Sequence, residues 1–230
     1  MASSCGAWRR RNISARSSRP GAALTAFFLV SLTLRAEDRF RAEVFFGSAW
    51  NAPTTLTIDQ SGEERLSFRA HWQTRPFDES PYFATRLGVW SGRRGWELQL
   101  LHHKIYLTNG QPEVPRFEVS HGWNLLTIHR AIRARPLDWR LGAGAVIAYP
   151  EGRIRGVSAN PGDGIFRSGY HVSGAGALVG GGKTFSITRR FFASVEGQLT
   201  YSWARVPIAR GHARTKNVAL HALVGLGFSR

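Results

Sequence analysis

The sequence of 230 residues has a single cysteine and no long hydrophobic run, and each absence excludes a class of protein. With Cys5 alone, the chain has neither a disulfide framework nor a paired-cysteine metal motif. The longest strongly apolar run, residues 22–34, has thirteen residues, whereas a helix needs about 20 to cross a bilayer. The sequence therefore predicts no disulfide and no membrane-spanning helix.

Acidic residues are also scarce, with 15 Asp and Glu against 31 Lys and Arg, and the formal net charge is +16. The basic residues are nearly all arginines, and they are spread along the chain instead of forming one block. Because a basic arm that binds nucleic acid is a block of like charges, we expect no nucleic-acid partner. A content of 43% hydrophobic residues is too high for a disordered basic chain, so we expect a folded protein.

The N-terminal region resembles an export signal. Arginines precede the apolar run 22–34, and Ala36 follows it as a small residue at a plausible cleavage point. We predict a signal peptide over residues 1–36 and a mature domain over residues 37–230; the alternative is a buried helix of a soluble protein. Loss of the signal would remove Cys5 and six arginines and leave a net charge of +10.

The mature chain alternates apolar and polar residues with a period of two, which indicates β-strands. In the last such segment, Leu220 and Val224 lie on an apolar face, while His221 and Gly225 lie on a face of small and polar residues. Small residues and isolated charges suit the narrow lumen of a barrel whose other face meets lipid. We predict an all-β antiparallel transmembrane β-barrel, with a soluble sandwich or a lipocalin-like barrel as the alternatives.

Ten strands are predicted, and eight are the alternative if residues 51–63 form an excursion and another weak segment drops out. Tryptophans lie near the ends of several strands, as an interfacial aromatic girdle requires. With the first strand running outward, short periplasmic turns such as Ser61-Gly62-Glu63 alternate with generally longer outer connections such as residues 150–167 and 205–213. The predicted strands span residues 42–50, 53–60, 64–73, 82–91, 95–107, 117–132, 138–149, 168–185, 190–204 and 214–228.

Two carboxylates are expected inside this barrel. Glu97 and Glu196 fall on polar faces, and a buried carboxylate is costly unless it is paired. We predict Arg86 and Arg140 as their partners and place Thr200 in the same lumen network. A structural role for this network is favoured over a catalytic one.

Histidines gather at the predicted outer rim, namely His71, His102, His103, His121 and His171. Together with Lys104, Tyr106, Tyr82 and Arg86, such imidazoles suit a divalent-metal site or acid and base catalysis. We take His102 and His121 as the candidate metal ligands. The alternative is that these side chains are inert polar residues at the interface or in the lumen.

Arginines also lie in the predicted outer connections. Guanidinium groups bind phosphate with a bidentate fork, so these residues are candidates for contact with the phosphates of lipopolysaccharide. Solvated loop charge is the alternative. The candidates are Arg116, Arg153, Arg155 and Arg167.

Four segments carry a resemblance to a known family: residues 80–86, 96–106, 120–127 and 196–202. The spacing Glu-x4-His-x-Lys-x-Tyr in the second segment is among the most specific features. Together the segments resemble the outer-membrane barrel family that includes the lipid A oxidases, with a looser likeness to small OmpA/OmpW-like barrels.

The resemblance implies oxygen-dependent oxidation of the proximal glucosamine of lipid A to an aminogluconate unit, with a divalent metal ion as cofactor. This sequence departs from the family pattern at Gln99 and Gln198, where relatives tend to carry charged residues. The matching polar positions are Tyr82, Arg86, Glu97, His102, Lys104, Tyr106, Asn124, Thr127, Glu196 and Thr200.

The sequence thus predicts a monomeric barrel in the outer membrane of a Gram-negative bacterium, in contact with the lipid bilayer and with lipopolysaccharide. One hypothesis is a lipid A-modifying enzyme that acts at the outer leaflet. The other is a non-enzymatic barrel, either structural or a conduit for small apolar molecules. The catalytic candidates of the first hypothesis are His102, Lys104, Tyr106, Arg86 and Tyr82.

Overall fold

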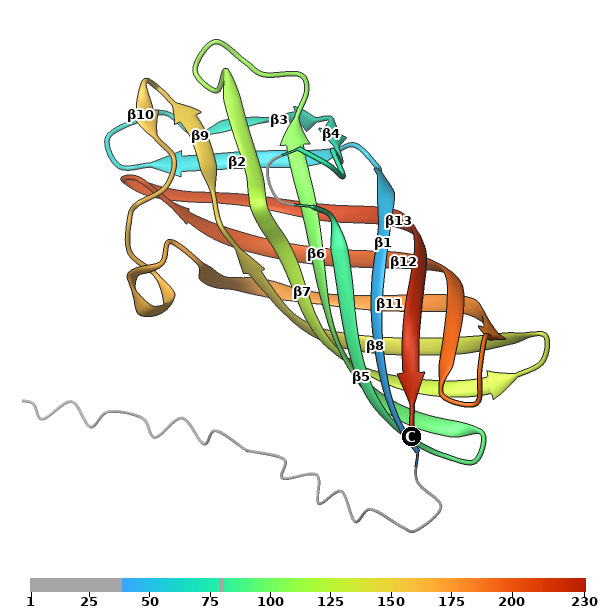
Figure 1. Ribbon diagram of the computed structural model, residues 1–230. Coiled ribbons are helices and arrows are strands. Elements are labelled where there is room, and N and C mark those ends of the chain that lie inside the picture. Colours follow the sequence, from blue (N-terminus) through green and yellow to red (C-terminus); the bar gives the residue numbers. More distant parts are fainter. Residues whose placement is uncertain (1–38, 79–80) are drawn as a thin grey trace, which may run out of the picture. The chain divides into compact units, whose positions relative to one another are not determined.

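The computed structural model describes residues 39–78 and 81–230, and the predicted signal peptide lies outside them. Long antiparallel strands dominate this part of the chain (Figure 1), and no helix within it is long and apolar enough to span a membrane. The elements are β1 (Arg39–Asn51), β2 (Thr54–Gln60), β3 (Leu66–Ala70), β4 (Trp72–Gln73), β5 (Phe83–Ser91), β6 (Arg94–Leu107), β7 (Arg116–Ala134), β8 (Leu137–Ala148), β9 (Glu151–Ile154), β10 (Val157–Ser158), the 3-10 helix η1 (Ile165–Arg167), β11 (His171–Ser186), β12 (Phe191–Ile208) and β13 (Gly211–Ser229).

Eight of these strands close into a ring. Their order around the ring is β1, β5, β6, β7, β8, β11, β12 and β13, and all neighbours are antiparallel. Pairing of β1 with β13 closes the barrel, with Asn51 opposite Ala219 and Arg41 opposite Ser229. The alternative count of eight therefore describes the ring, and the predicted count of ten does not.

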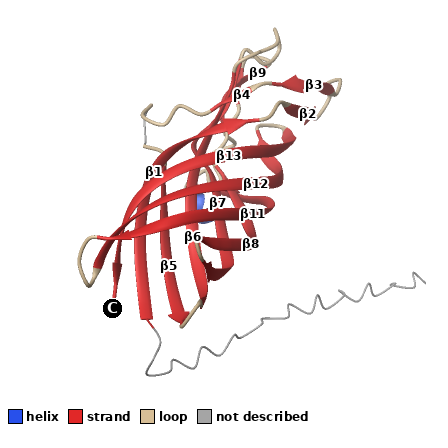
Figure 2. Ribbon diagram, turned by 90° about the vertical axis from the view of Figure 1, so that its right-hand side faces the viewer, coloured by secondary structure: helices blue, strands red, loops and turns tan. Residues whose placement is uncertain are grey.

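The difference in strand number arises from the segment between β1 and β5. β2 has seven residues and β3 has five, whereas a barrel strand needs about 9–11 residues to cross a membrane. β2 pairs with one end of β13, with Leu56 opposite Thr215, and β3 pairs with β2. The turn Ser61-Gly62-Glu63 is therefore the tip of a hairpin at the end of the barrel opposite the C-terminus (Figure 2), and its placement among the periplasmic turns was wrong.

The connections differ in length between the two ends of the barrel. At the end where β1 begins and β13 ends, which we call the short-turn end, the connections are residues 92–93, 135–136 and 187–190. At the opposite end, which we call the long-connection end, they include residues 52–78, 108–115 and 149–170. The predicted loop 205–213 is instead a tight turn, because β12 and β13 remain paired as far as Ile208 opposite Gly211.

Side chains alternate across the wall of the barrel as the sequence predicted. Along β12, Val195, Leu199 and Trp203 are 52%, 48% and 45% exposed on the outside. Glu196 and Thr200 lie between them and are buried in the lumen. The period-two pattern therefore places apolar side chains outward and polar side chains inward in the ring.

A hydrophobic core forms at the long-connection end. Leu56 and Ile58 of the β2–β3 hairpin are completely buried there, together with Ile105 of β6. Phe117 of β7 and Ile154 of β9 belong to the same cluster. Burial of these apolar groups fixes the hairpin and the extended strand ends on the barrel, while the middle of the lumen remains polar.

Candidate functional site

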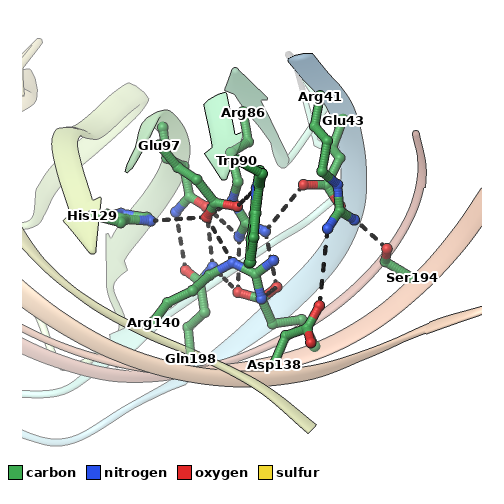
Figure 3. A network of polar contacts seen from close by, with 12 residues as sticks. Arg41, Glu43, Arg86, Trp90, Glu97, His129, Asp138, Arg140, Ser194 and Gln198 are labelled. Atoms are coloured by element: carbon green, nitrogen blue, oxygen red, sulfur yellow. Dashed lines mark hydrogen bonds and ion pairs between the residues drawn. The ribbon is translucent and has the colours of Figure 1, made fainter. Parts of the chain in front are cut away.

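Arg86 on β5 lies at the centre of a charged cluster inside the barrel (Figure 3). Its guanidinium donates two hydrogen bonds to Glu196, from Nη1 to Oε2 at 3.0 Å and from Nη2 to Oε1 at 2.8 Å. The same group lies 3.6 Å from a carboxylate oxygen of Glu43 and 3.6 Å from one of Glu97. One buried arginine is therefore shared by three carboxylates.

Two further arginines complete the cluster. Arg140 donates from Nε to Oε2 of Glu97 at 2.8 Å, and its Nη1 lies 2.9 Å from Oε2 of Glu196. Arg41 lies 3.5 Å from Glu43. With three arginines and three glutamates, the formal charges cancel. We call this group the lumen network: Arg41, Glu43, Arg86, Glu97, Arg140 and Glu196.

Two glutamines link the charged groups of the lumen network. Oε1 of Gln99 accepts hydrogen bonds from Nε of Arg86 at 3.0 Å and from its Nη2 at 2.6 Å. The amides of Gln99 and Gln198 lie 3.1 Å apart, and Nε2 of Gln198 donates to Glu196 at 2.7 Å. Neutral amides at these positions leave the charge balance of the network unchanged.

Side chains fill the lumen at the level of this network. Every member is at most 6% exposed, and an eight-stranded barrel is just wide enough for side chains to fill its interior. In such a setting, removal of one charge leaves a partner buried and uncompensated. The network is therefore a fixed set of ion pairs that ties together β1, β5, β6, β8 and β12.

A second polar group, the histidine cluster, lies in the same lumen and comprises Tyr82, Thr200, His221, His103 and Asn51. His221 engages both ring nitrogens, Nδ1 with the hydroxyl of Tyr82 at 2.6 Å and Nε2 with Oγ1 of Thr200 at 2.8 Å. His103 bonds Oδ1 of Asn51 at 2.9 Å, and the two imidazole centroids are 4.9 Å apart. All five side chains are buried, so the cluster is a hydrogen-bonded lining.

Lys104 and Tyr106 lie apart from both groups, at the long-connection end of β6. The ammonium of Lys104 donates to the carbonyl of Asp78. The guanidinium of Arg75 lies 4.7 Å above the ring of Tyr106. Both side chains thus contact the connection that leads into β5.

His102 points away from the lumen, because it shares the outward face of β6 with Leu98, while His103 next to it points inward. Its ring stacks on Phe83 with centroids 5.0 Å apart, and Nδ1 lies 2.7 Å from Oδ1 of Asn124. The structure does not bring the five catalytic candidates into one pocket: Tyr82, Arg86, His102, Lys104 and Tyr106.

The residues at the predicted metal position do not form a ligand set. His102 bonds Asn124, while Nδ1 of His121 lies 2.9 Å from Oε2 of Glu151. Within residues 39–78 and 81–230, no group of three or more His, Cys, Asp or Glu side chains is arranged to hold a metal ion. The side chains present therefore do not fit the divalent metal that the family resemblance implies.

The four phosphate-binding candidates lie at the long-connection end. Arg116 and Arg153 are exposed and stand opposite each other across β7 and β9, and Arg116 also forms an ion pair with Glu118. Arg155 is engaged by the hairpin turn, where Nη2 donates to a backbone carbonyl at 2.7 Å. Arg167 lies in η1. Of the four candidates, Arg116 and Arg153 are thus the two that lie next to each other.

Asp59 anchors the β2–β3 hairpin to β13. Its carboxylate accepts hydrogen bonds at 2.5 Å from Arg65 and at 2.5 Å from Arg214, and His212 lies 3.3 Å away. The hydrogen bond from Arg65, and after it in size the one from Arg214, holds the pKa of Asp59 below its ordinary value. A lowered carboxyl pKa stabilises the folded state at neutral pH, and that contribution is lost as the pH falls through the folded pKa.

Several inward residues were missing from the candidate site residues. Arg41 and Glu43 share the inward face of β1 with Phe45, and His221 lies on the polar face of β13. The alternation that located Glu97 contains the same signal for them. A candidate list that followed the alternation of inward and outward side chains along each whole strand would have included all three.

The chain matches no protein-family model and no curated protein. Among solved structures it is similar to Ail, the attachment invasion locus protein of Yersinia pestis, with 12% identity, a TM-score of 0.43, and coverage of 84% of this chain and 99% of that one. It is also similar to the outer membrane protein OprG from Pseudomonas aeruginosa, with 9% identity, a TM-score of 0.40, and coverage of 84% and 95%.

A further similarity is to the outer membrane protein AlkL, whose structure was determined in DMPC bilayers by solid-state NMR. The identity is 8% and the TM-score 0.46, over 96% of this chain and 97% of that one. Identities and TM-scores this low describe a general likeness, so the functional assignment rests on this chain's own residues.

Proposed function

We propose that this protein is a monomeric outer-membrane β-barrel whose interior is a fixed polar core and whose long-connection end binds the phosphates of lipopolysaccharide. The observation that carries the proposal is an apolar belt around a filled, charge-balanced lumen. Each of the eight ring strands contributes a large apolar side chain that is between 43% and 66% exposed. These are Phe46, Leu87, Leu98, Ile128, Leu141, Val179, Leu199 and Leu220.

This belt is unsuited to water and suited to lipid. Monomeric soluble proteins rarely expose contiguous apolar patches larger than a few hundred Å², and here the exposed apolar residues follow the whole ring. Trp96 and Trp139 are exposed near the short-turn end, while Trp50 and Trp203 are exposed toward the long-connection end. Tryptophans at two levels are typical of aromatic girdles at the two faces of a membrane.

The lengths of the connections support one orientation in the membrane. Barrels of the outer membrane have short turns on the periplasmic side and longer loops outside. The short-turn end would accordingly face the periplasm, and the β2–β3 hairpin would stand outside the cell. Arg116 and Arg153 would then lie above the outer leaflet, which carries lipopolysaccharide.

Replacing both Arg116 and Arg153 by glutamine is expected to weaken binding of lipopolysaccharide by about tenfold or more. Charge-assisted hydrogen bonds contribute about 1.5–3 kcal/mol each, and 1.4 kcal/mol corresponds to a factor of about ten. The measurement is titration of purified barrel in neutral detergent with lipopolysaccharide. Arg93→Gln/Arg94→Gln at the short-turn end is the charge-matched control, and equal affinities for the two double variants would contradict the proposed binding surface.

Lipid A is a ligand in this proposal and not a substrate. The separation of the catalytic candidates and the lack of a metal ligand set among the described residues both favour the non-enzymatic hypothesis. Mass spectra of lipid A from aerated cells with and without the gene are expected to be identical. A gain of one oxygen that depends on the gene would contradict the proposal and support lipid A oxidation.

A further inference from the structure

A cavity of about 930 Å³ opens at the short-turn end of the barrel, below the lumen network. We call it the vestibule. The ends of β1, β5, β11 and β12 and the turn between β7 and β8 line it, and Asp138 is the only acidic residue of its lining. Six arginines line the same space: Arg39, Arg41, Arg133, Arg135, Arg189 and Arg190.

The charges of the vestibule are unbalanced, in contrast to those of the lumen network. Asp138 lies 3.6 Å from Arg133 and 3.9 Å from Arg41, so its charge is already shared. The other four arginines form no ion pair with any residue that the structure describes. A concave, basic surface of this kind concentrates anions.

Arg41 provides a preformed anchor at the inner end of the vestibule. It is only 4% exposed, and its guanidinium is stacked 4.3 Å from the ring centroid of Phe192 and 5.2 Å from that of Trp90. Figure 3 shows Arg41 and Asp138 on the same side of the lumen network. Nε and Nη1 of Arg41 are buried and have no hydrogen-bond acceptor.

Buried donors without an acceptor are costly, and a ligand oxygen would remove that cost. Arg133 stacks 5.0 Å from the same Trp90 ring, so two guanidinium groups flank one indole. Planar guanidinium forks match phosphate oxygens, and several of them together suit a group of more than one negative charge. The volume of about 930 Å³ also has room for more than inorganic phosphate alone.

We propose that the vestibule is a binding site for phosphate groups, with Arg41 as the buried anchor and the turn arginines Arg189 and Arg190 at its mouth. The phosphate has two potential sources, a phospholipid headgroup of the inner leaflet or a soluble phosphate compound. Only the assignment to the periplasmic side rests on the proposed function. The recognition itself follows from the residues that line the vestibule.

The test uses the full-length barrel in neutral detergent, titrated with pyrophosphate by isothermal calorimetry. Arg41→Gln and, separately, Arg189→Gln/Arg190→Gln are each expected to raise the Kd about tenfold or more. The control Arg69→Gln/Arg205→Gln, which removes two charges at the long-connection end, is expected to leave the Kd unchanged. Because Arg41 also belongs to the lumen network, the exposed double variant keeps the test valid if Arg41→Gln does not fold.

Competition identifies the source of the phosphate. Displacement of pyrophosphate by phosphatidylglycerol, but not by phosphatidylcholine, in mixed micelles would assign the site to a lipid headgroup, and no displacement would assign it to a soluble phosphate. Absence of pyrophosphate and phosphatidylglycerol binding, or equal affinity in the Arg189→Gln/Arg190→Gln variant and the control, would overturn the proposal. Insertion of the same protein preparations into lipid vesicles, measured separately, reports on the proposed membrane function independently.

Discussion

Replacing Arg86 by glutamine is expected to lower the free energy of unfolding of the barrel by about 3–5 kcal/mol, the usual cost of breaking a buried ion pair from one side. Arg86 contacts Glu43, Glu97 and Glu196 and is 1% exposed. Its removal leaves three glutamates and two arginines in a buried space, with one negative charge uncompensated. The measurement is urea unfolding in lipid vesicles, in which the folded fraction is read from heat-modifiable migration on a gel.

A second substitution separates charge balance from the loss of contacts. Arg86→Gln combined with Glu196→Gln restores neutrality, so the double variant is expected to recover a substantial part of the lost stability. Arg94→Gln, an exposed arginine at the start of β6, is the control and is expected to change little. Stability of Arg86→Gln equal to that of the control would show that the network does not hold the barrel together.

Placing an arginine at Leu199 is expected to destabilise the barrel in a bilayer by about 2–4 kcal/mol, the cost of a basic side chain at the middle of the membrane. Leu199 is 48% exposed on the outward face of β12, between Val195 and Trp203. On the surface of a soluble protein the same change would be nearly neutral, because surface substitutions usually fall within about 0.5 kcal/mol. The result therefore distinguishes a lipid-facing belt from a water-facing one.

The matched control for Leu199→Arg is Thr55→Arg. Thr55 is exposed on β2, in the hairpin outside the ring. Unfolding in vesicles is expected to be unchanged for this variant. Equal unfolding free energies for both variants and the native chain would contradict the membrane placement of the belt.

The sequence alone predicted the strands of the ring because alternation is a local property. The predicted segments 117–132 and 138–149 correspond to β7 (Arg116–Ala134) and β8 (Leu137–Ala148). Strand number was harder, because a short hairpin and two crossing strands show the same alternation and the same turn residues. The predicted segment 64–73 is long enough to cross a membrane, and only in the structure are β2 and β3 seen to be too short, with seven and five residues.

The site was predictable where a single rule decides it. Buried carboxylates need cationic partners, so Arg86 and Arg140 followed from Glu97 and Glu196, and the structure contains these ion pairs. The predicted histidine rim took into account only that each histidine lies near a strand end. It neglected whether the side chain points into the lumen or out of the barrel. His102 illustrates the consequence, because neighbouring residues of a strand point to opposite sides of the wall.

The shift of register between β6 and β7 is a further feature that the sequence did not reveal. The register with β7 shifts between His103 and Ile105, which places Lys104 at the irregularity. The extra residues lie on β7, where residues 120–122 face the single residue Lys104 of β6. Lys104 and Tyr106 contact the connection before β5 and do not join Arg86 in the lumen.

The most direct test of the account measures which side chains of β12 meet lipid. Because Cys5 is the only cysteine of the chain, Cys5→Ser allows single spin-labelled cysteines at Val195, Leu199 and Tyr201, with Thr55 as the water-exposed reference. In lipid vesicles, we predict that the three β12 labels collide with oxygen and not with a polar nickel complex, while the label at 55 shows the reverse. Nickel access at all four positions would contradict the transmembrane barrel.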